Sequence, residues 1–252
     1  MITLTVLGCD GSYSGPAGGT SGGSSSGAAS GYLVRSWGSG TSLWLDAGPG
    51  TFANLQRFCD PMALSGVVLT HEHCDHFSDI ENLLTAARWV IGFRREPIPV
   101  YASPGIRPKL AQDIDGILDW REVGDGDGVR LGDLQVSFSR TDHPPVTHAV
   151  RIEGELGALG YSADSGPGWS LEALGPGLDL ALCEATYTTK FQGTAGHMTG
   201  REAGSTARAA SVRRLVITHR WPTVRAEDVR AEAEETFGGP VSQAAIGRGY
   251  SI

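Results

Sequence analysis

Lysine and cysteine are scarce in this 252-residue sequence, and positive charge is in deficit. Lys109 and Lys190 are its lysines, and 28 acidic residues against 20 basic ones give a formal charge of −8. This balance argues against a protein that grips a nucleic-acid backbone, because such proteins usually present a basic face. The four cysteines form no C-x-x-C pair, so the sequence predicts neither a disulfide framework nor a zinc ribbon.

Long apolar runs are also missing. No stretch approaches the roughly 18 apolar residues of a membrane span, and the chain enters a strand pattern at Ile2 without the charged and apolar regions of a signal peptide. We therefore expect a cytoplasmic protein with no membrane partner. Hydrophobic residues at 40% and charged residues at 19% are typical of a globular protein.

Alternating apolar residues and turn signals predict many short strands interspersed with helices. Strands are expected at residues 2–8, 32–35, 42–46, 67–70, 99–102, 129–131, 134–140, 146–152, 158–161, 178–183, 215–218 and 241–246, and helices at 78–90, 105–118, 201–210 and 226–237. Ser78 is the expected N-cap of the first helix. No repeat or linker divides the chain, which indicates one α/β domain over residues 1–252 with more than one sheet.

One segment differs in composition from the rest of the chain. Between Ser12 and Gly31, 14 of 20 residues are Gly or Ser, which predicts a flexible loop joining two strands. The alternative interpretation is a mobile flap over a site, since long loops inside compact domains are often functional.

The candidate chemistry is concentrated where a buried strand ends. The run GVVLT is followed by HEHCDH, which places His71, His73, Asp75 and His76 within six residues. A strand that feeds a loop and then a helix can direct several such side chains at one point. Imidazole and carboxylate are ligands that suit zinc and similar divalent ions.

HEHCDH resembles the H-x-H-x-D-H signature of the metallo-β-lactamase superfamily, and later motifs match that family in order. TDHPP places His143 at the third-motif histidine, GYSADSG places Asp164 at the aspartate that bridges two metals, and VITHR places His219 at the last ligand histidine. LWLDAGPG resembles the early motif whose aspartate, here Asp46, supports the site from behind the ligands. The resemblance covers nearly the whole chain and implies a four-layer αββα sandwich.

The same resemblance implies two divalent metal ions, with zinc favoured and manganese or iron as alternatives. The first ion would be bound by His71, His73 and His143. The second would be bound by Asp75, His76 and His219, with Asp164 bridging the two. Asp75 would also orient the attacking water and take its proton.

The stretch DLALCEATYTTKFQGTAGHMTGREAG resembles the ribonuclease Z branch of the superfamily. That branch has a glutamate after a strand, here Glu184, and a histidine in an H-x-T context before a helix, here His197. In that branch the histidine lies beside the scissile phosphate and the glutamate orients it. A carboxylate keeps an imidazole protonated, so that it can stabilise phosphorane charge or protonate the leaving oxygen.

Two features separate this chain from a tRNA 3′-processing endoribonuclease. The common bacterial form of that enzyme inserts a basic tRNA-clamping arm between the third-motif histidine and the bridging aspartate, but here only 20 residues separate His143 from Asp164. The net charge is also negative.

The motifs LGCDGS, LCEATY and FGGPV resemble compact relatives that are linked to cyclic-nucleotide hydrolysis. A phosphodiesterase for a small phosphodiester such as a cyclic nucleotide, without stable nucleic-acid binding, is therefore expected.

Three alternatives remain open at this stage. They are tRNA 3′ processing by a ribonuclease Z, hydrolysis of a non-phosphate ester or thioester, and a non-catalytic metal-containing accessory protein. The family resemblance also implies a homodimer.

Overall fold

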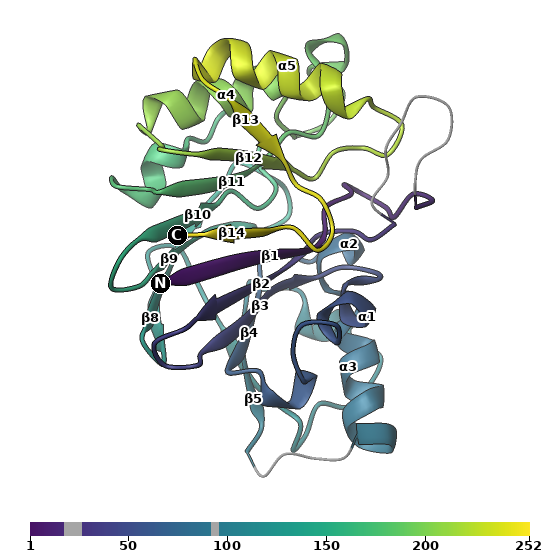
Figure 1. Ribbon diagram of the computed structural model, residues 1–252. Coiled ribbons are helices and arrows are strands. Elements are labelled where there is room, and N and C mark those ends of the chain that lie inside the picture. The colour runs from purple at the N-terminus through teal and green to yellow at the C-terminus, as the bar shows by residue number, and fades with distance from the viewer. Residues whose placement is uncertain (18–26, 92–95) are drawn as a thin grey trace.

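The computed structural model describes residues 1–17, 27–91 and 96–252. Two seven-stranded sheets stack face to face, and helices cover the outer face of each (Figure 1). The helices are α1 (Thr51–Leu55), α2 (Cys74–Phe77), α3 (Ile80–Ala86), α4 (Gly200–Ala209) and α5 (Ala226–Phe237). This arrangement confirms the predicted four-layer αββα sandwich.

The first sheet contains the N-terminal half of the chain and the last strand, in the order β14-β1-β2-β3-β4-β5-β6. Its strands are β1 (Ile2–Gly8), β2 (Gly31–Ser36), β3 (Ser42–Ala47), β4 (Gly66–Leu69), β5 (Ile98–Ala102), β6 (Leu118–Glu122) and β14 (Gly249–Ser251). The pairs from β14 to β3 are antiparallel, and those from β3 to β6 are parallel. Because β3, β4 and their neighbours run in parallel, their carboxyl ends meet at the same edge of the sheet.

The second sheet has the order β13-β12-β11-β10-β9-β8-β7. Its strands are β7 (Gly128–Leu131), β8 (Leu134–Arg140), β9 (His148–Glu153), β10 (Ala158–Tyr161), β11 (Leu180–Glu184), β12 (Leu215–Thr218) and β13 (Val241–Gln243). The pairs from β10 to β13 are parallel, and those from β7 to β10 are antiparallel, so the ends of several strands also meet at one edge of this sheet.

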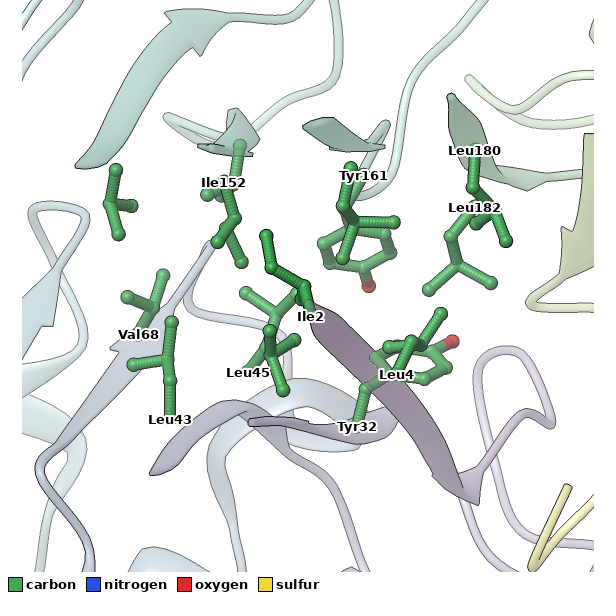
Figure 2. Packing of buried hydrophobic residues seen from close by; sticks show 14 of the residues in the cluster. Ile2, Leu4, Tyr32, Leu43, Leu45, Val68, Ile152, Tyr161, Leu180 and Leu182 are labelled. Carbon is green, nitrogen blue, oxygen red and sulfur yellow. The ribbon is translucent and has the colours of Figure 1, made fainter. Parts of the chain in front are cut away.

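Apolar side chains from both sheets interdigitate between them (Figure 2). The alternation of β1 explains the layering, because Ile2 and Leu4 face this inter-sheet core whereas Leu7 packs toward the helices on the other face. Full burial of such a side chain contributes about 1.5–3 kcal/mol. The inter-sheet core includes Ile2, Leu4, Tyr32, Leu43, Leu45, Val68, Ile152, Tyr161, Leu180 and Leu182.

Two helix predictions were wrong in part. Residues 105–118 form no long helix but a 3-10 turn at Arg107–Lys109, followed by β6. Gly105 and Gly116 have φ of 93° and 75°, and Pro108 lies between them, so this segment cannot sustain regular helix hydrogen bonding.

The helix predicted over residues 78–90 begins two residues later, as α3, and continues as a π turn at Ala87–Ile91. Ser78 is not its N-cap. The Ser78 hydroxyl donates to the carbonyl oxygen of Cys74 at 2.5 Å, at the end of α2.

The predicted flexible loop at 12–31 falls partly on residues 18–26, outside the described residues. Its described ends converge on Asp10, whose Oδ2 accepts hydrogen bonds from the backbone N–H of Gly15 at 3.1 Å and of Gly27 at 3.2 Å. Within the described ranges, no helix is both long and apolar enough to span a bilayer.

Candidate metal and catalytic centre

The seven predicted ligands come from the ends of strands in both sheets. The first two follow β4, the next two lie on α2, and the others follow β8, β10 and β12. All but one are buried, and the exception is partly buried. These residues are His71, His73, Asp75, His76, His143, Asp164 and His219.

Three histidines converge on one oxygen of Asp164. His71 Nε2 lies 3.0 Å and His143 Nε2 lies 3.2 Å from His73 Nδ1. Asp164 Oδ2 lies 3.4 Å from His71 Nε2 and 3.8 Å from His143 Nε2. Four potential ligand atoms therefore surround one point.

A second group converges on the other oxygen of Asp164. His219 Nε2 lies 3.2 Å from Asp75 Oδ2 and 3.3 Å from Asp164 Oδ1. His76 Nε2 lies 3.5 Å from Asp75 Oδ2 and 3.2 Å from Asp164 Oδ1. Asp164 thus turns one carboxylate oxygen toward each group.

Hydrogen bonds behind the ligands determine which ring nitrogen faces the centre. His143 Nδ1 donates to the carbonyl oxygen of Gly196 at 2.8 Å, and His76 Nδ1 donates to Asp46 Oδ2 at 2.7 Å. These acceptors hold the proton on Nδ1, so the Nε2 lone pair points into the site.

The donor set fits two divalent cations. His76 Nε2 and Asp164 Oδ1 are buried and have no hydrogen-bond partner among the described residues, although buried polar atoms are normally satisfied. A tetrahedral site with Zn–N distances of about 2.0–2.1 Å places ligand atoms roughly 3.3 Å apart. The measured separations of 3.0–3.8 Å lie around that value. The two groups are therefore consistent with a binuclear metal site.

The pKa shifts of three of these residues favour the deprotonated forms in which histidine and aspartate bind metals. Burial, reinforced by the charge of His76, lowers the pKa of His71 to about 4. Burial raises the pKa of Asp75, but the nearby His76 and His219 outweigh it and the net pKa is strongly lowered. The carboxylate of Asp164 likewise has a pKa well below its usual range, because three histidines overcome the effect of burial.

The pKa of His76 is shifted in the opposite direction to that of His71. Burial lowers its pKa, yet the carboxylates of Asp164, Asp75 and Asp46 raise it well above the usual value. Without metal, a proton on His76 compensates part of the negative charge of the cluster. A bound cation would displace this proton, so we expect metal affinity to increase as the pH rises.

Asp46 lies behind the second group at the end of β3, fully buried. Its Oδ1 accepts a hydrogen bond from the backbone N–H of Thr70 at 2.8 Å. Its Oδ2 accepts three more, from His76 Nδ1, from the Thr70 hydroxyl at 2.9 Å and from the Tyr161 hydroxyl at 2.9 Å. With four donors, this carboxylate holds the His76 ring in place.

Tight backbone geometry surrounds the ligands. Asp46 and His219 adopt left-handed φ values of 55° and 54°, which non-glycine residues adopt only when the surrounding structure enforces them. A Cβ on Gly48 would lie 2.0 Å from the carbonyl oxygen of Asp75, and one on Gly11 would lie 2.4 Å from that of His219. Glycine is therefore required at both positions for the chain to approach the site so closely.

His197 and Glu184 form a buried pair beside both groups. His197 Nδ1 lies 3.0 Å from Glu184 Oε1 and 4.0 Å from Asp164 Oδ2. The His197 ring centroid lies 4.8 Å from that of His143 and 5.2 Å from that of His219. Burial lowers the pKa of His197, but the carboxylate of Glu184 raises it, and the net value is about 9. The Glu184 carboxylate therefore favours the protonated form of this imidazole, next to the candidate metal site.

Sequence reasoning missed three residues that hold these groups. Tyr161 donates to Asp46, and the hydroxyls of Thr70 and Thr186 contact the Nδ1 atoms of His71 and His219. The signal in the sequence was their place in or beside the quoted motifs: Tyr161 lies in GYSADSG, Thr70 directly before His71, and Thr186 two residues after Glu184.

A two-sheet αββα sandwich with a His/Asp centre at its strand ends is the arrangement of the metallo-β-lactamase fold. Residues 41–220 match the family model described as "Beta-lactamase superfamily domain". The chain belongs to this family, as the sequence motifs predicted.

Individual relatives agree with this assignment. An uncharacterized protein of Mycobacterium leprae is 35% identical over 100% of this chain and 89% of its own length. The "Probable metallo-hydrolase YhfI" of Bacillus subtilis is 29% identical over 97% of both chains, and its crystal structure superposes with a TM-score of 0.85 over 100% of both. A ribonuclease Z of Methanopyrus kandleri is 29% identical over 79% of this chain and 84% of its own length. Family and centre together identify a metallo-hydrolase.

Removing divalent ions should lower the melting temperature. Without a cation, the negative charges and lone pairs that converge on the centre repel one another. At 100–1,000 times its Kd, a bound ion stabilises by about 3–4 kcal/mol, which corresponds to roughly 5–15 °C for a protein of this size. Calorimetry of chelated protein, with and without added Zn²⁺ or Mn²⁺, measures the shift. Ca²⁺ is the control, since it prefers oxygen ligands and should restore little. Equal melting temperatures in all samples would contradict a metal site.

Proposed function

We propose that this protein is a phosphodiesterase that hydrolyses a small phosphodiester, such as a cyclic nucleotide, with two divalent ions at the centre. The observation that carries the proposal is the buried His197–Glu184 pair, with its 3.0 Å contact, beside the bridging Asp164. A cationic imidazole held there matches the needs of phosphoryl chemistry, where negative charge develops on oxygens around phosphorus.

Each residue has a distinct role in the proposed reaction. Two bound divalent cations, proposed to be Zn²⁺ with Mn²⁺ or Fe²⁺ as alternatives, would act as Lewis acids toward the phosphate and the attacking water. Asp75 orients this water and accepts its proton, while the backbone N–H of Ser12 fixes Asp75 Oδ2 at 2.8 Å. As water oxygen bonds to phosphorus and the bond to the leaving oxygen breaks, His197 donates a proton to that oxygen. Glu184 holds the His197 ring throughout.

The path of the chain between His143 and Asp164 supports a small substrate. This segment contains β9 and β10, which pair antiparallel and are joined by residues 154–157 alone. All of it lies within the described range 96–252, and it leaves no room for an RNA-binding arm there. Similarity to a ribonuclease Z nevertheless makes tRNA 3′ processing the second candidate.

A substrate panel tests the proposal. Bis(p-nitrophenyl) phosphate, 3′,5′-cyclic nucleotides, precursor tRNA, a thioester and a lactone are each incubated with protein loaded with Zn²⁺ or Mn²⁺. We expect turnover of the phosphodiesters and little of the thioester or lactone. Preferred turnover of a carboxylic ester or thioester would refute a phosphodiesterase, and inactivity on the whole panel despite bound metal would indicate a non-catalytic accessory protein.

Replacing His197 with alanine should lower kcat while both metal ions are retained. His197 Nδ1 is occupied by Glu184, so the imidazole is oriented by the protein and acts on the leaving oxygen in the transition state. Loss of such a proton donor costs about 10²–10⁴-fold in rate. Steady-state kinetics and elemental analysis are measured on the same preparations. Loss of one metal ion from His197→Ala would show instead that His197 is a ligand, in line with its place near Asp164 and His219.

A further inference from the structure

Thr186 lies where three segments meet: the ends of β11 and β12 and the loop before α4. It is fully buried, two residues beyond the end of β11. Its backbone N–H donates to the carbonyl oxygen of Met198 at 3.0 Å, and its carbonyl oxygen accepts the N–H of Trp221 at 3.0 Å. The residue therefore joins the segment carrying Glu184 to those carrying His197 and His219.

The hydroxyl group of Thr186 has three close neighbours. Its Oγ1 lies 2.7 Å from Glu184 Oε2, 2.9 Å from His219 Nδ1 and 3.0 Å from the carbonyl oxygen of His219. A hydroxyl has one proton and two acceptor lone pairs. The proton goes to the buried carboxylate, which is the nearest and most strongly accepting partner. His219 Nδ1 then donates its own proton to Oγ1.

This direction of hydrogen bonding fixes the tautomer of His219. With the proton on Nδ1, the lone pair of His219 Nε2 points at the centre, 3.2 Å from Asp75 Oδ2 and 3.3 Å from Asp164 Oδ1. Without the hydroxyl, Nδ1–H keeps no side-chain acceptor in a buried site, which is a costly state. The imidazole is then more stable if it rotates or if its proton moves to Nε2. A proton on Nε2 occupies the lone pair that would bind the metal.

The same hydroxyl also fixes the carboxylate that orients His197. Glu184 is fully buried and accepts four hydrogen bonds, two at each oxygen. Oε1 receives Ser165 N–H at 2.6 Å and His197 Nδ1, and Oε2 receives Thr186 Oγ1 and Met198 N–H at 3.1 Å. Thr186 contributes the one hydroxyl among these donors, and losing it frees Glu184 to rotate about its last bond.

The first sheet repeats this arrangement on the other side of the centre. Thr70 Oγ1 donates to Asp46 Oδ2 at 2.9 Å and accepts from His71 Nδ1 at 3.2 Å. In both sheets a buried threonine past a strand end links a histidine of the metal site to a buried carboxylate. The recurrence indicates a functional geometry rather than incidental packing.

From this geometry we infer that Thr186 is a positioning residue that couples the second metal site to the His197–Glu184 pair. The inference rests on the proposed metal-dependent hydrolysis for its effect on rate, but its effect on metal affinity is independent of any substrate. A single hydroxyl thereby sets both the ligand geometry of His219 and the orientation of the proton donor.

Thr186→Val tests this, because valine keeps the branched shape and removes the hydroxyl. We expect the affinity for one of the two ions to fall about 10–100-fold, as when other hydrogen-bond partners of metal-binding histidines are removed. We expect kcat to fall as well, while KM changes little. Competition with a chromogenic chelator and the absorption spectrum of Co²⁺-loaded protein report the weakened site without any turnover. Thr186→Ser restores the hydroxyl and should recover both properties to within about twofold.

Thr206→Val is the matched control. Thr206 is also buried, and its hydroxyl contacts Leu171 N–H at 2.8 Å and Ser170 Oγ at 3.2 Å, away from both metal groups. Unchanged metal affinity and Co²⁺ spectrum in Thr186→Val, or failure of serine to recover them, would overturn the inference. Thr186→Ala replaces the valine variant if that variant does not fold. If the wild-type protein is inactive but Thr186→Val still weakens metal binding, the proposed reaction is refuted and the role of Thr186 in the metal site is retained.

Discussion

Asp75→Asn should abolish phosphodiester hydrolysis almost completely, with kcat/KM falling by about 10³-fold or more. Asparagine keeps the size of the side chain but lacks the negative charge, and it cannot accept a proton from water. Loss of a general base alone costs about 10²–10⁴-fold. Asp75 Oδ2 also lies 3.2 Å from His219 Nε2 and 3.5 Å from His76 Nε2, so the second metal site weakens at the same time.

Kinetics on bis(p-nitrophenyl) phosphate and metal analysis measure these two losses separately. Glu72→Gln is the matched control, because Glu72 is a carboxylate in the same motif that pairs with Lys109 at 3.4 Å instead of joining the cluster. Its effect should stay within about twofold. If Asp75→Asn keeps more than a tenth of the wild-type kcat/KM, Asp75 is not the general base.

The convergence of the seven His and Asp residues was predictable because each follows a strand closely, with Asp75 and His76 on the short helix α2 after β4. The carboxyl ends of parallel strands meet at one edge of a sheet, which brings Asp164 after β10 and His219 after β12 close together. The family resemblance indicated that the motif after β4, in the other sheet, lies at the same place. Spacing in the sequence, together with the family resemblance, therefore located the centre without knowledge of side-chain packing.

The residues that hold the ligands could not be found in the same way. Thr186 and His219 are 33 positions apart, and they become neighbours because β11 and β12 pair in parallel with Glu184 opposite Thr218. That register depends on tertiary packing and has no local signature. An isolated threonine after a strand is too common to be recognised as a hydrogen-bond partner.

Local breaker residues account for the largest error in the fold prediction. Apolar residues between 105 and 118 have helical spacing, but two glycines with positive φ and Pro108 override it. The apolar residues of this segment, among them Ile106 and Ile114, still pack into the core beside the first sheet. The helix predicted for this segment was therefore wrong, although its apolar side chains are buried.

A small phosphodiester should be hydrolysed with a kcat/KM on the order of 100-fold or more above that for precursor tRNA at physiological salt. A tRNA-processing enzyme depends on many contacts to backbone phosphates, and losing several of them costs orders of magnitude in affinity. Here β9 and β10 fill the chain between His143 and Asp164, and the formal charge of −8 repels a polyanion. A small substrate would need no such contacts, because two bound ions and His197 would hold its single phosphate.

Initial rates for 3′,5′-cyclic nucleotides, bis(p-nitrophenyl) phosphate and precursor tRNA, measured from low to high salt with one metal-loaded preparation, test this preference. Any cleavage of tRNA should decline steeply with salt, whereas hydrolysis of the small substrates should change little, because few counterions are released on binding one phosphate. Asp75→Asn protein purified in parallel reveals contaminating nuclease. A specificity constant for precursor tRNA above that of every small phosphodiester would assign RNA processing to this centre, with the tRNA held by a surface other than the segment between His143 and Asp164.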